Sequence, residues 1–237
     1  MDKSSSGVYE LFQTVRPDCE TRTDCAQEVN RLAQCLENPT QGTIKAIKRV
    51  MAYLAGTTDR SLLVPVTTEI EWLAFSDSDH AGDRRMDTRS RTGVLIMLNG
   101  MPIHWQSVKQ PVTALSSTEA EIYALSETIK AVKHRYWIAE ELGTEVTWPA
   151  QVKCDNSACI QFQHNNTSDT KLKGVIQLRD NWVQELRKDG IVTAVKVPTD
   201  LNLADMMAKC LSYATRKRLD DELVRLAMCA KNSSPVI

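Results

Sequence analysis

Four carboxylates in this chain stand where one secondary-structure element is predicted to begin or end. They are Asp77, Glu121, Asp155 and Asp205. Each acid alone is explained by helix capping or turn formation, because carboxylates are favourable near helix N-termini and in loops. A strand that carries an acid to its end can also build a metal site, since hard cations take carboxylate oxygens as ligands. The residue types alone leave both explanations open.

The first of these acids lies in a stretch rich in carboxylates. Residues 75–83 read Phe-Ser-Asp-Ser-Asp-His-Ala-Gly-Asp and follow Glu-Trp-Leu-Ala, an apolar and aromatic run typical of a strand. The seven cysteines form no CxxC pair and no Cys/His spacing of the kind that binds zinc. A metal site here would therefore be built from oxygen ligands.

Composition limits the protein class and the way it could bind nucleic acid. The chain has 237 residues, of which 42% are hydrophobic and 25% charged, and this predicts one main domain with an appendage. Because the formal net charge is -1, contacts with nucleic acid would have to come from local basic clusters. A solvated polar face is the more ordinary explanation of each cluster taken alone. They are Arg84, Arg85, Arg89 and Arg91, and Lys130, Lys133, His134 and Arg135.

The cysteine count and the N-terminal residues indicate the compartment. An odd number of cysteines without a pairing pattern argues against a disulfide framework and favours a reducing environment. The first seven residues lack the apolar core of a signal peptide, and no apolar run approaches the roughly 20 residues that a spanning helix needs. We expect an intracellular protein, cytoplasmic or nuclear, that is not secreted and has no membrane partner.

Apolar periodicity predicts a helical hairpin before the main domain. Apolar residues recur at helical spacing over 29–36 and again over 44–54, and Asn-Pro-Thr at 38–40 separates the two runs. Gly56 is the predicted stop of the second helix. Residues 1–20 receive no assignment.

From about Ile70 the pattern becomes that of a mixed α/β domain. Asn99-Gly100 between apolar runs is a strong hairpin signal, so the first three strands should form an antiparallel meander, with Pro102 at a sheet edge. Alternative capping boxes over 116–121 begin a long helix that ends near Gly143. The predicted strands cover about 71–74, 92–98, 101–106, 151–154 and 191–197, and the later helices about 157–163, 178–186, 204–211 and 213–229.

Six short motifs occur together and in order along this domain. They read FSDSDHAGD at 75–83, TG at 92–93, PIHWQSVKQP at 102–111, ALSSTEAE at 114–121, CDNSA at 154–158 and VPTDLNLAD at 197–205. Together they resemble the ribonuclease H domain of copia-type LTR retrotransposon Pol polyproteins. The resemblance extends over roughly residues 21–212, so that 21–62 is similar to the connector at the end of the preceding reverse transcriptase.

The resemblance implies a fold, a division of the chain and a set of site residues. It implies a ribonuclease H-like five-stranded mixed sheet flanked by helices over 70–212, after the helical hairpin at 21–62 and before a C-terminal amphipathic helix and tail at 213–237. The family's catalytic acids map by motif onto Asp77, Glu121, Asp155 and Asp205, which would also be the metal ligands. Asp79, Asp83 and Glu119 are less favoured neighbours.

The implied activity is metal-dependent hydrolysis of the RNA strand of RNA/DNA hybrids. Two Mg2+ ions, with Mn2+ as an alternative, would activate a water and relieve charge on the departing oxygen. Asp77 would bridge both ions, Glu121 and Asp155 would hold one, and Asp205 would help to hold the other. The weaker substrate candidates are Ser78, Asn156, Lys171 and Lys173. A separate reverse transcriptase is a further candidate partner.

The chain also departs from the family's pattern. The family's loop before the late helix contains His, whereas residues 168–179 read SDTKLKGVIQLR, which keeps lysines only. The polymerase, integrase and protease motifs of a complete Pol polyprotein are absent, so we expect a fragment or a host-resident remnant that cannot polymerise DNA by itself. An inactive or co-opted module that binds nucleic acid or a protein partner is the alternative function.

Overall fold

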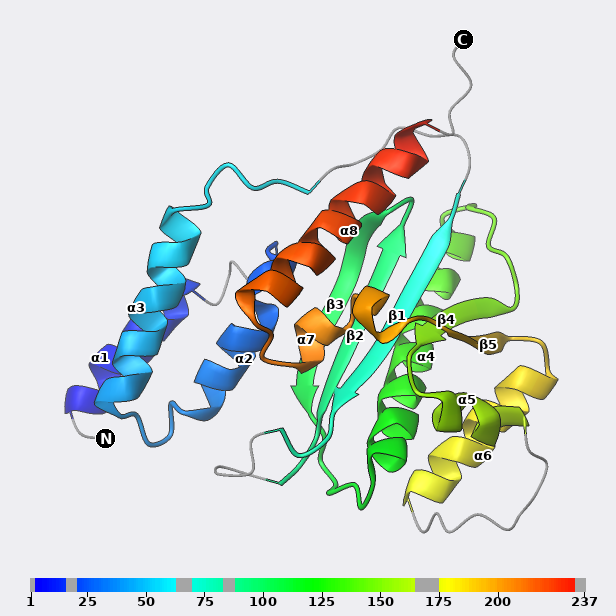
Figure 1. Cartoon of the computed structure of the whole chain (residues 1–237), viewed down its shortest axis with the longest axis horizontal. Helices are drawn as coiled ribbons and strands as arrows, with labels where there is room; N and C mark the ends of the chain where they lie inside the picture. Colours follow the sequence, from blue (N-terminus) through cyan, green and yellow to red (C-terminus); the bar gives the residue numbers. More distant parts are fainter. Residues whose placement is uncertain (1–2, 16–20, 63–69, 83–87, 165–174, 233–237) are drawn as a thin grey trace. The chain divides into compact units, whose positions relative to one another are not determined.

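The computed structural model of the chain describes residues 3–15, 21–62, 70–82, 88–164 and 175–232 (Figure 1). The chain forms two units, Met1–Leu62 and Leu63–Ile237, and each has its own apolar core. Among the described residues no helix is long and apolar enough to cross a membrane.

The first unit contains the predicted helical hairpin and one helix that the sequence did not indicate. Helices α2 (Ala26–Gln34) and α3 (Gln41–Ala55) form the hairpin, with Gly56 at the end of α3 as predicted. Helix α1 (Lys3–Val15) lies in the segment that had no assignment and adds three apolar side chains to the shared core. That core consists of Val8, Phe12, Val15, Cys25, Val29, Leu32 and Ile47.

A buried carboxylate ties the ends of this hairpin together. Asp24, in a single 3-10 turn (Thr23–Cys25), is 6% exposed and accepts hydrogen bonds from Arg22, Tyr53 and Arg60 at 2.6–2.9 Å. These donors hold the pKa of the Asp24 carboxyl well below its usual range, against the opposing effect of burial. The residue stabilises the fold of this unit.

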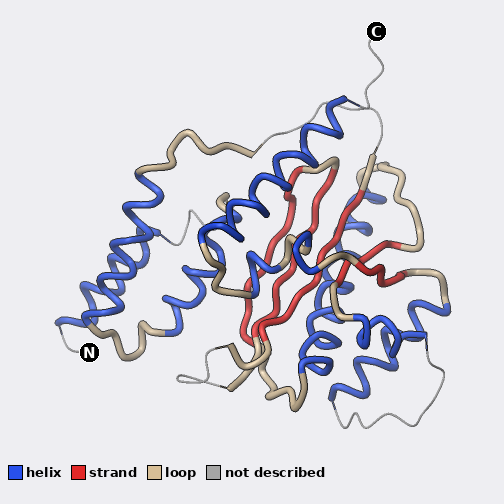
Figure 2. The backbone as a smooth tube through the Cα atoms, in the orientation of Figure 1, coloured by secondary structure: helices blue, strands red, loops and turns tan. Residues whose placement is uncertain are grey.

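The second unit is built on a five-stranded mixed sheet in the order β3-β2-β1-β4-β5 (Figure 2). Strands β1 (Trp72–Asp79), β2 (Arg91–Leu98) and β3 (Met101–Lys109) form the predicted antiparallel meander. Strands β4 (Ala150–Cys154) and β5 (Val192–Lys196) lie beyond β1 and parallel to it. Since β1 has neighbours on both sides, it is the central strand.

Strand β1 is longer than the sequence predicted. The apolar run at 71–74 indicated its first half and Asp77 was expected at its end; the strand continues to Asp79, and Ser76, Asp77 and Ser78 pair with Val94, Gly93 and Thr92 of β2. These polar residues are buried under other elements, so the alternation and apolarity that mark a strand in sequence are missing there. Asp77 is therefore fixed by the sheet's hydrogen-bond ladder.

The turn between β2 and β3 has the predicted chemistry. Asn99 and Gly100 adopt positive φ values of 52° and 75°, as a type I′ hairpin requires. The Asn99 side chain also accepts a hydrogen bond from the Glu71 backbone N–H at 2.7 Å. Pro102 lies on β3, at the edge of the sheet, where a missing backbone donor is tolerated.

Helices cover both faces of this sheet. Helices α4 (Ser117–Glu141), α5 (Ser157–His164) and α6 (Val175–Lys188) lie on one face, and α7 (Asp205–Ala208) and α8 (Tyr213–Asn232) lie on the other (Figure 1). The main apolar core lies between α4, α6 and the sheet and includes Val94, Ile122, Val152 and Val183. This arrangement of helices on a sheet of order 3-2-1-4-5 is an RNase H-like fold.

Capping at the start of α4 differs in detail from the prediction. The Ser116 hydroxyl accepts a hydrogen bond from the Glu119 backbone N–H at 3.2 Å, which is one half of a capping box. The Glu119 carboxylate, however, accepts from the Leu115 backbone N–H at 2.7 Å. It therefore stabilises the chain before the helix, and Glu121 begins the face that meets the sheet.

Gly93 is the point where α7 rests on the sheet. A Cβ atom added at this position would lie 2.5 Å from the carbonyl oxygen of Ala204 and 2.8 Å from the backbone nitrogen of Ala208. Both are backbone atoms, which cannot turn away as a side chain can. Because Gly93 is also paired with Asp77, its missing side chain lets α7 approach the strand that carries the first acid.

We predict that Gly93→Ala destabilises the second unit by about 1–3 kcal/mol, the usual cost of overpacking a tight contact. Denaturant unfolding followed by circular dichroism measures this effect. Gly7→Ala, in α1, is the control, because an added Cβ there meets nothing within 4 Å and no loss is expected. An unfolding midpoint of Gly93→Ala equal to that of the parent would contradict the close contact.

Candidate metal centre

Three of the four predicted acids meet at the ends of β1 and β4 and the start of α4. Oxygen atoms of Asp77, Glu121 and Asp155 all lie within 4.8 Å of one another. The parallel pairing of Phe75 with Lys153, continued in register, brings Asp77 level with Asp155. Glu121 projects from α4 close to its start, and this helix packs against both strands. Folding thus gathers residues that are far apart in the sequence.

The donor atoms of this cluster fit a hard divalent cation. Asp77 has no solvent exposure and Glu121 is 7% exposed. One oxygen of each, Asp77 Oδ2 and Glu121 Oε2, is buried without a hydrogen-bond partner. Buried carboxylate oxygens are ordinarily paired, and oxygen-only sites suit Mg2+, Mn2+ or Ca2+. These three residues could therefore hold a metal ion.

Asp205 joins the site through a lysine. The ammonium of Lys209 lies 2.9 Å from Asp77 Oδ1 and 2.9 Å from Asp205 Oδ1. Asp205 is the first residue of α7, and Lys209 follows the last one, so the two are one helical turn apart. The fourth predicted acid thus reaches the same corner of the sheet as Asp77.

Helix α7 is held in place by Asn202 as well as by the contact with Gly93. The Asn202 side chain is completely buried and donates from Nδ2 to the carbonyl oxygen of Ser76 at 3.1 Å. Its Oδ1 accepts from the backbone N–H of Ala204 at 3.3 Å. Because Ser76 precedes Asp77 on β1, this pair of hydrogen bonds sets the distance between the two acid-bearing segments.

Sequence reasoning missed Lys209 and Asn202. A signal for the lysine was present, because residues four apart on a helix are neighbours and an Asp-Lys pair at that spacing attracts. The signal for Asn202 was weaker, because a single amide in a loop more often makes a local turn. The partners of both side chains lie on β1, far away in the sequence, so the sequence does not show these contacts.

Burial and mutual repulsion govern the charges of the cluster. Burial raises the pKa of the Asp77 carboxyl well above its usual value, and the neighbouring Glu121 and Asp205 raise it further. Burial, with the charge of Asp155, raises the pKa of Glu121 to about 8. The pKa of Asp205 is also raised by burial, while Lys209 opposes these shifts. Without a metal, the site therefore holds protons at neutral pH.

The weaker acidic candidates have other surroundings. Asp79 lies at the end of β1, where its carboxylate occupies the space that a side chain at position 82 would need. The Glu119 carboxylate accepts a hydrogen bond from the Leu115 backbone N–H. Asp83 lies outside the described residues.

The predicted substrate residues are placed as follows. Asn156 follows Asp155, and its side chain caps α5 by accepting from the Cys159 backbone N–H at 2.9 Å. Ser78 is buried on β1, and its hydroxyl has no hydrogen-bond partner. Lys171 and Lys173 lie outside the described residues. Their contacts with a substrate stay predictions.

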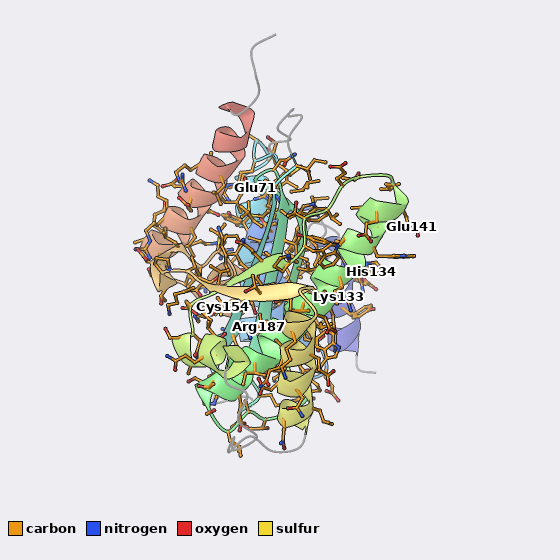
Figure 3. The ribbon with its side chains drawn as sticks, turned by 90° about the vertical axis from the view of Figure 1, so that its right-hand side faces the viewer. Glu71, Lys133, His134, Glu141, Cys154 and Arg187 are labelled. Atoms are coloured by element: carbon orange, nitrogen blue, oxygen red, sulfur yellow. The ribbon has the colours of Figure 1, made fainter. Side chains whose placement is uncertain are left out.

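The two basic clusters are described only in part. Arg91 is 8% exposed and donates to the Ser107 hydroxyl at 3.3 Å, so its predicted place in a surface cluster is wrong. Arg89 is exposed, while Arg84 and Arg85 lie outside the described residues. Lys133 and His134 lie on α4, and Cys154, next to Asp155, lies on β4 (Figure 3).

Comparisons with known proteins identify the family. No protein-family model matches the chain. The retrovirus-related Pol polyprotein from transposon RE1 of Arabidopsis thaliana is 33% identical over 192 residues, or 81% of this chain and 13% of the polyprotein. That from transposon TNT 1-94 of Nicotiana tabacum is 35% identical over 190 residues, or 80% of this chain and 14% of the polyprotein. The chain corresponds to a region of copia-type retrotransposon Pol polyproteins.

This chain spans about a seventh of the length of these copia-type Pol polyproteins. Among solved structures, the crystal structure of LC11-RNase H1 in complex with RNA/DNA hybrid is similar, with a TM-score of 0.43 and 15% identity. That similarity covers 58% of this chain and 94% of the other. This chain itself has the five-stranded sheet of order β3-β2-β1-β4-β5 and a cluster of acids able to hold a metal ion.

We predict that Mg2+ binding at pH 7 releases protons and that the apparent affinity rises with pH up to about 8. Glu121 has a pKa of about 8 without metal, so it is protonated at pH 7, whereas a metal ligand must be ionised. Isothermal titration calorimetry in buffers of different ionisation enthalpy measures the protons released.

Glu121→Gln should bind Mg2+ more weakly and release fewer protons. Glu119→Gln is the matched control, because its amide oxygen can still accept from Leu115 and its carboxylate is not in the cluster. If the heat of Mg2+ binding to the parent protein at pH 7 is the same in all buffers, no protons are released and the predicted coupling of metal binding to proton release is ruled out.

Proposed function

We propose that this chain is a metal-dependent endonuclease that hydrolyses the RNA strand of RNA/DNA hybrids. The observation that carries the proposal is the meeting of Asp77, Glu121 and Asp155, with two buried carboxylate oxygens that have no partner. Membership of the copia-type Pol family and the RNase H-like fold support the same activity. Mg2+ is the proposed ion, with Mn2+ as an alternative.

The chain's own residues would bind and orient the reacting groups. A divalent ion bound here would activate a water and neutralise charge on the leaving oxygen. Asp77, Glu121 and Asp155 would hold the ion, and Asp205 would add negative charge on the other side of Asp77. Lys196 donates a hydrogen bond to the Asp155 carbonyl oxygen and so fixes the end of β4 next to the site.

Substrate selection would depend on shape and on the 2′ hydroxyl more than on bases. Hybrids of this kind are recognised across a wide, shallow minor groove that displays sugar and phosphate groups. Asn156 and the lysines at 171 and 173 are the proposed contacts, together with Ser78 if the strand end opens on binding. The net charge of -1 means that these contacts must be local.

We also propose a functional division of the chain. Residues 21–62 would correspond to the connector at the end of a reverse transcriptase, 70–212 to the ribonuclease H domain and 213–237 to a C-terminal helix and tail. Helix α8 contacts β3, so the first part of that tail belongs to the second unit. A separate reverse transcriptase is the proposed protein partner.

One observation favours a second function, the binding of hybrids without cleavage. Lys209 already pairs with two of the acids, which reduces the need for a metal to neutralise them. A protein that kept the fold in this state would bind nucleic acid and leave it intact. The two functions differ in whether divalent ions change the substrate.

The test is cleavage of a labelled RNA/DNA hybrid by the purified protein with Mg2+. We expect cleavage within the RNA strand, its loss in EDTA, and a fall in rate on the order of 100-fold or more for Asp77→Asn, as when one preorganised charged group is removed. Asp189→Asn, an exposed carboxylate after α6, should cleave like the parent.

Two results would count against the enzyme. Binding of the hybrid without metal-dependent cleavage would favour the second function. Equal cleavage by the parent and Asp77→Asn would show that the activity comes from elsewhere.

A further inference from the structure

Lys209 lies between two of the acids that the resemblance assigns to a second metal ion. The resemblance implied two divalent ions bridged by Asp77, one of them on the side of Asp205. In this chain the ammonium of Lys209 contacts one oxygen of each of these two residues, at 2.9 Å in both cases. A cation already lies between the carboxylates that would hold the second ion.

The two oxygens of Asp77 are used differently. Oδ1 accepts a hydrogen bond from Lys209, whereas Oδ2 is buried and has no hydrogen-bond partner. Glu121 also has a buried oxygen without a hydrogen-bond partner, and oxygens of Asp77, Glu121 and Asp155 lie within 4.8 Å of one another. Asp77 therefore pairs one oxygen with the ammonium of Lys209, and its other oxygen remains available to a divalent metal ion.

Several contacts keep the ammonium at this place. Lys209 directly follows α7, and the backbone of α7 lies against Gly93, the partner of Asp77 in the sheet. The Lys209 side chain is 30% exposed, so most of it is packed, and both of its acid partners are less than 10% exposed. The neighbouring acids raise the pKa of the ammonium, which keeps its charge at neutral pH.

Electrostatic repulsion prevents Lys209 and a divalent ion from both lying between Asp77 and Asp205. Two cations a few ångströms apart repel each other strongly in a buried site, where solvent screening is weak. A divalent ion between Asp77 and Asp205 would have to displace Lys209 and leave its charge without partners. An ion at Asp77 Oδ2, Glu121 and Asp155 meets no such competitor among the contacts described.

We propose that Lys209 is a built-in cation that occupies the second ion position, so that the free protein binds one divalent ion, at Asp77, Glu121 and Asp155. This inference rests on the proposed function for the identity of the site, and it changes the number of ions from two to one. A purely structural role for Lys209 would stabilise α7 without altering how many ions bind.

The experiment is titration of the metal-free protein with Mn2+, with bound and free ion counted by electron paramagnetic resonance. We expect one bound ion in the parent and two in Lys209→Met, which keeps the length of the side chain and removes its charge. Lys217→Met, an exposed lysine on α8, is the matched control and should bind one ion.

Asp205→Asn provides a second variant in case Lys209→Met does not fold without metal. If Lys209 takes the place of the second ion, the Asp205→Asn variant still binds one ion. A variant that binds no ion would show that Asp205 is itself a metal ligand. Circular dichroism in EDTA reports whether each variant is folded before titration.

Each outcome separates this inference from the proposed function. Two ions in the parent, or one ion or none in Lys209→Met, would overturn the assignment of Lys209 even if the hybrid is cleaved. One ion in the parent and two in Lys209→Met, without cleavage of the hybrid, would support the assignment and refute the nuclease.

Discussion

A carboxylate that has lost all contact with water needs a cation or a proton. Asp77 is in this position, at the centre of a sheet and beside three other acids. The rest of the second unit can be understood from this constraint. The ladder of β1 fixes the acid, α4 and β4 add two more carboxylates, and α7 with the residue after it adds a further carboxylate and a lysine. The free energy for holding these groups together must come from the apolar core around them.

The contact between α7 and the sheet illustrates how a small feature supports this arrangement. A helix of four residues has little stability of its own. Here its backbone approaches β2 at the one residue without a side chain, and Asn202 connects its start to β1. The acids and the lysine are thus positioned by backbone contacts, which are more rigid than contacts between long side chains.

Much of the fold could be predicted from the sequence because its signals are local. Asn99-Gly100, Pro102, Ser116 and Gly56 each encode a turn, an edge or a helix end by their own chemistry. Asp77 was expected on the first strand, but the burial of Ser76 and Ser78 beside it could not be predicted, since a strand buried under other elements can carry polar residues when its partners satisfy them. For the same reason Arg91 was expected at the surface, although it is buried beside Ser107.

The candidate site also has residues that the sequence indicated and one that it did not. Motif resemblance indicated four acids, and three of them meet closely in the structure. Lys209 was overlooked because a lysine near an acid is common on helices and usually means a surface ion pair. Only the folded structure shows that its second partner is Asp77, on a strand 132 residues earlier in the chain.

The late position of α7 has a consequence for the order in which the protein is made. On the ribosome, where domains form as the chain emerges, all five strands are available once β5 has been synthesised. Asp77, Glu121 and Asp155 can then come together, while Asn202 and Lys209 are still to be added. During that interval the nascent chain carries an acid cluster without its own cation, so protons or cellular metal ions would have to compensate it. Helix α7 and Lys209 therefore complete the centre by adding a cation that the chain itself supplies to Asp77 and Asp205.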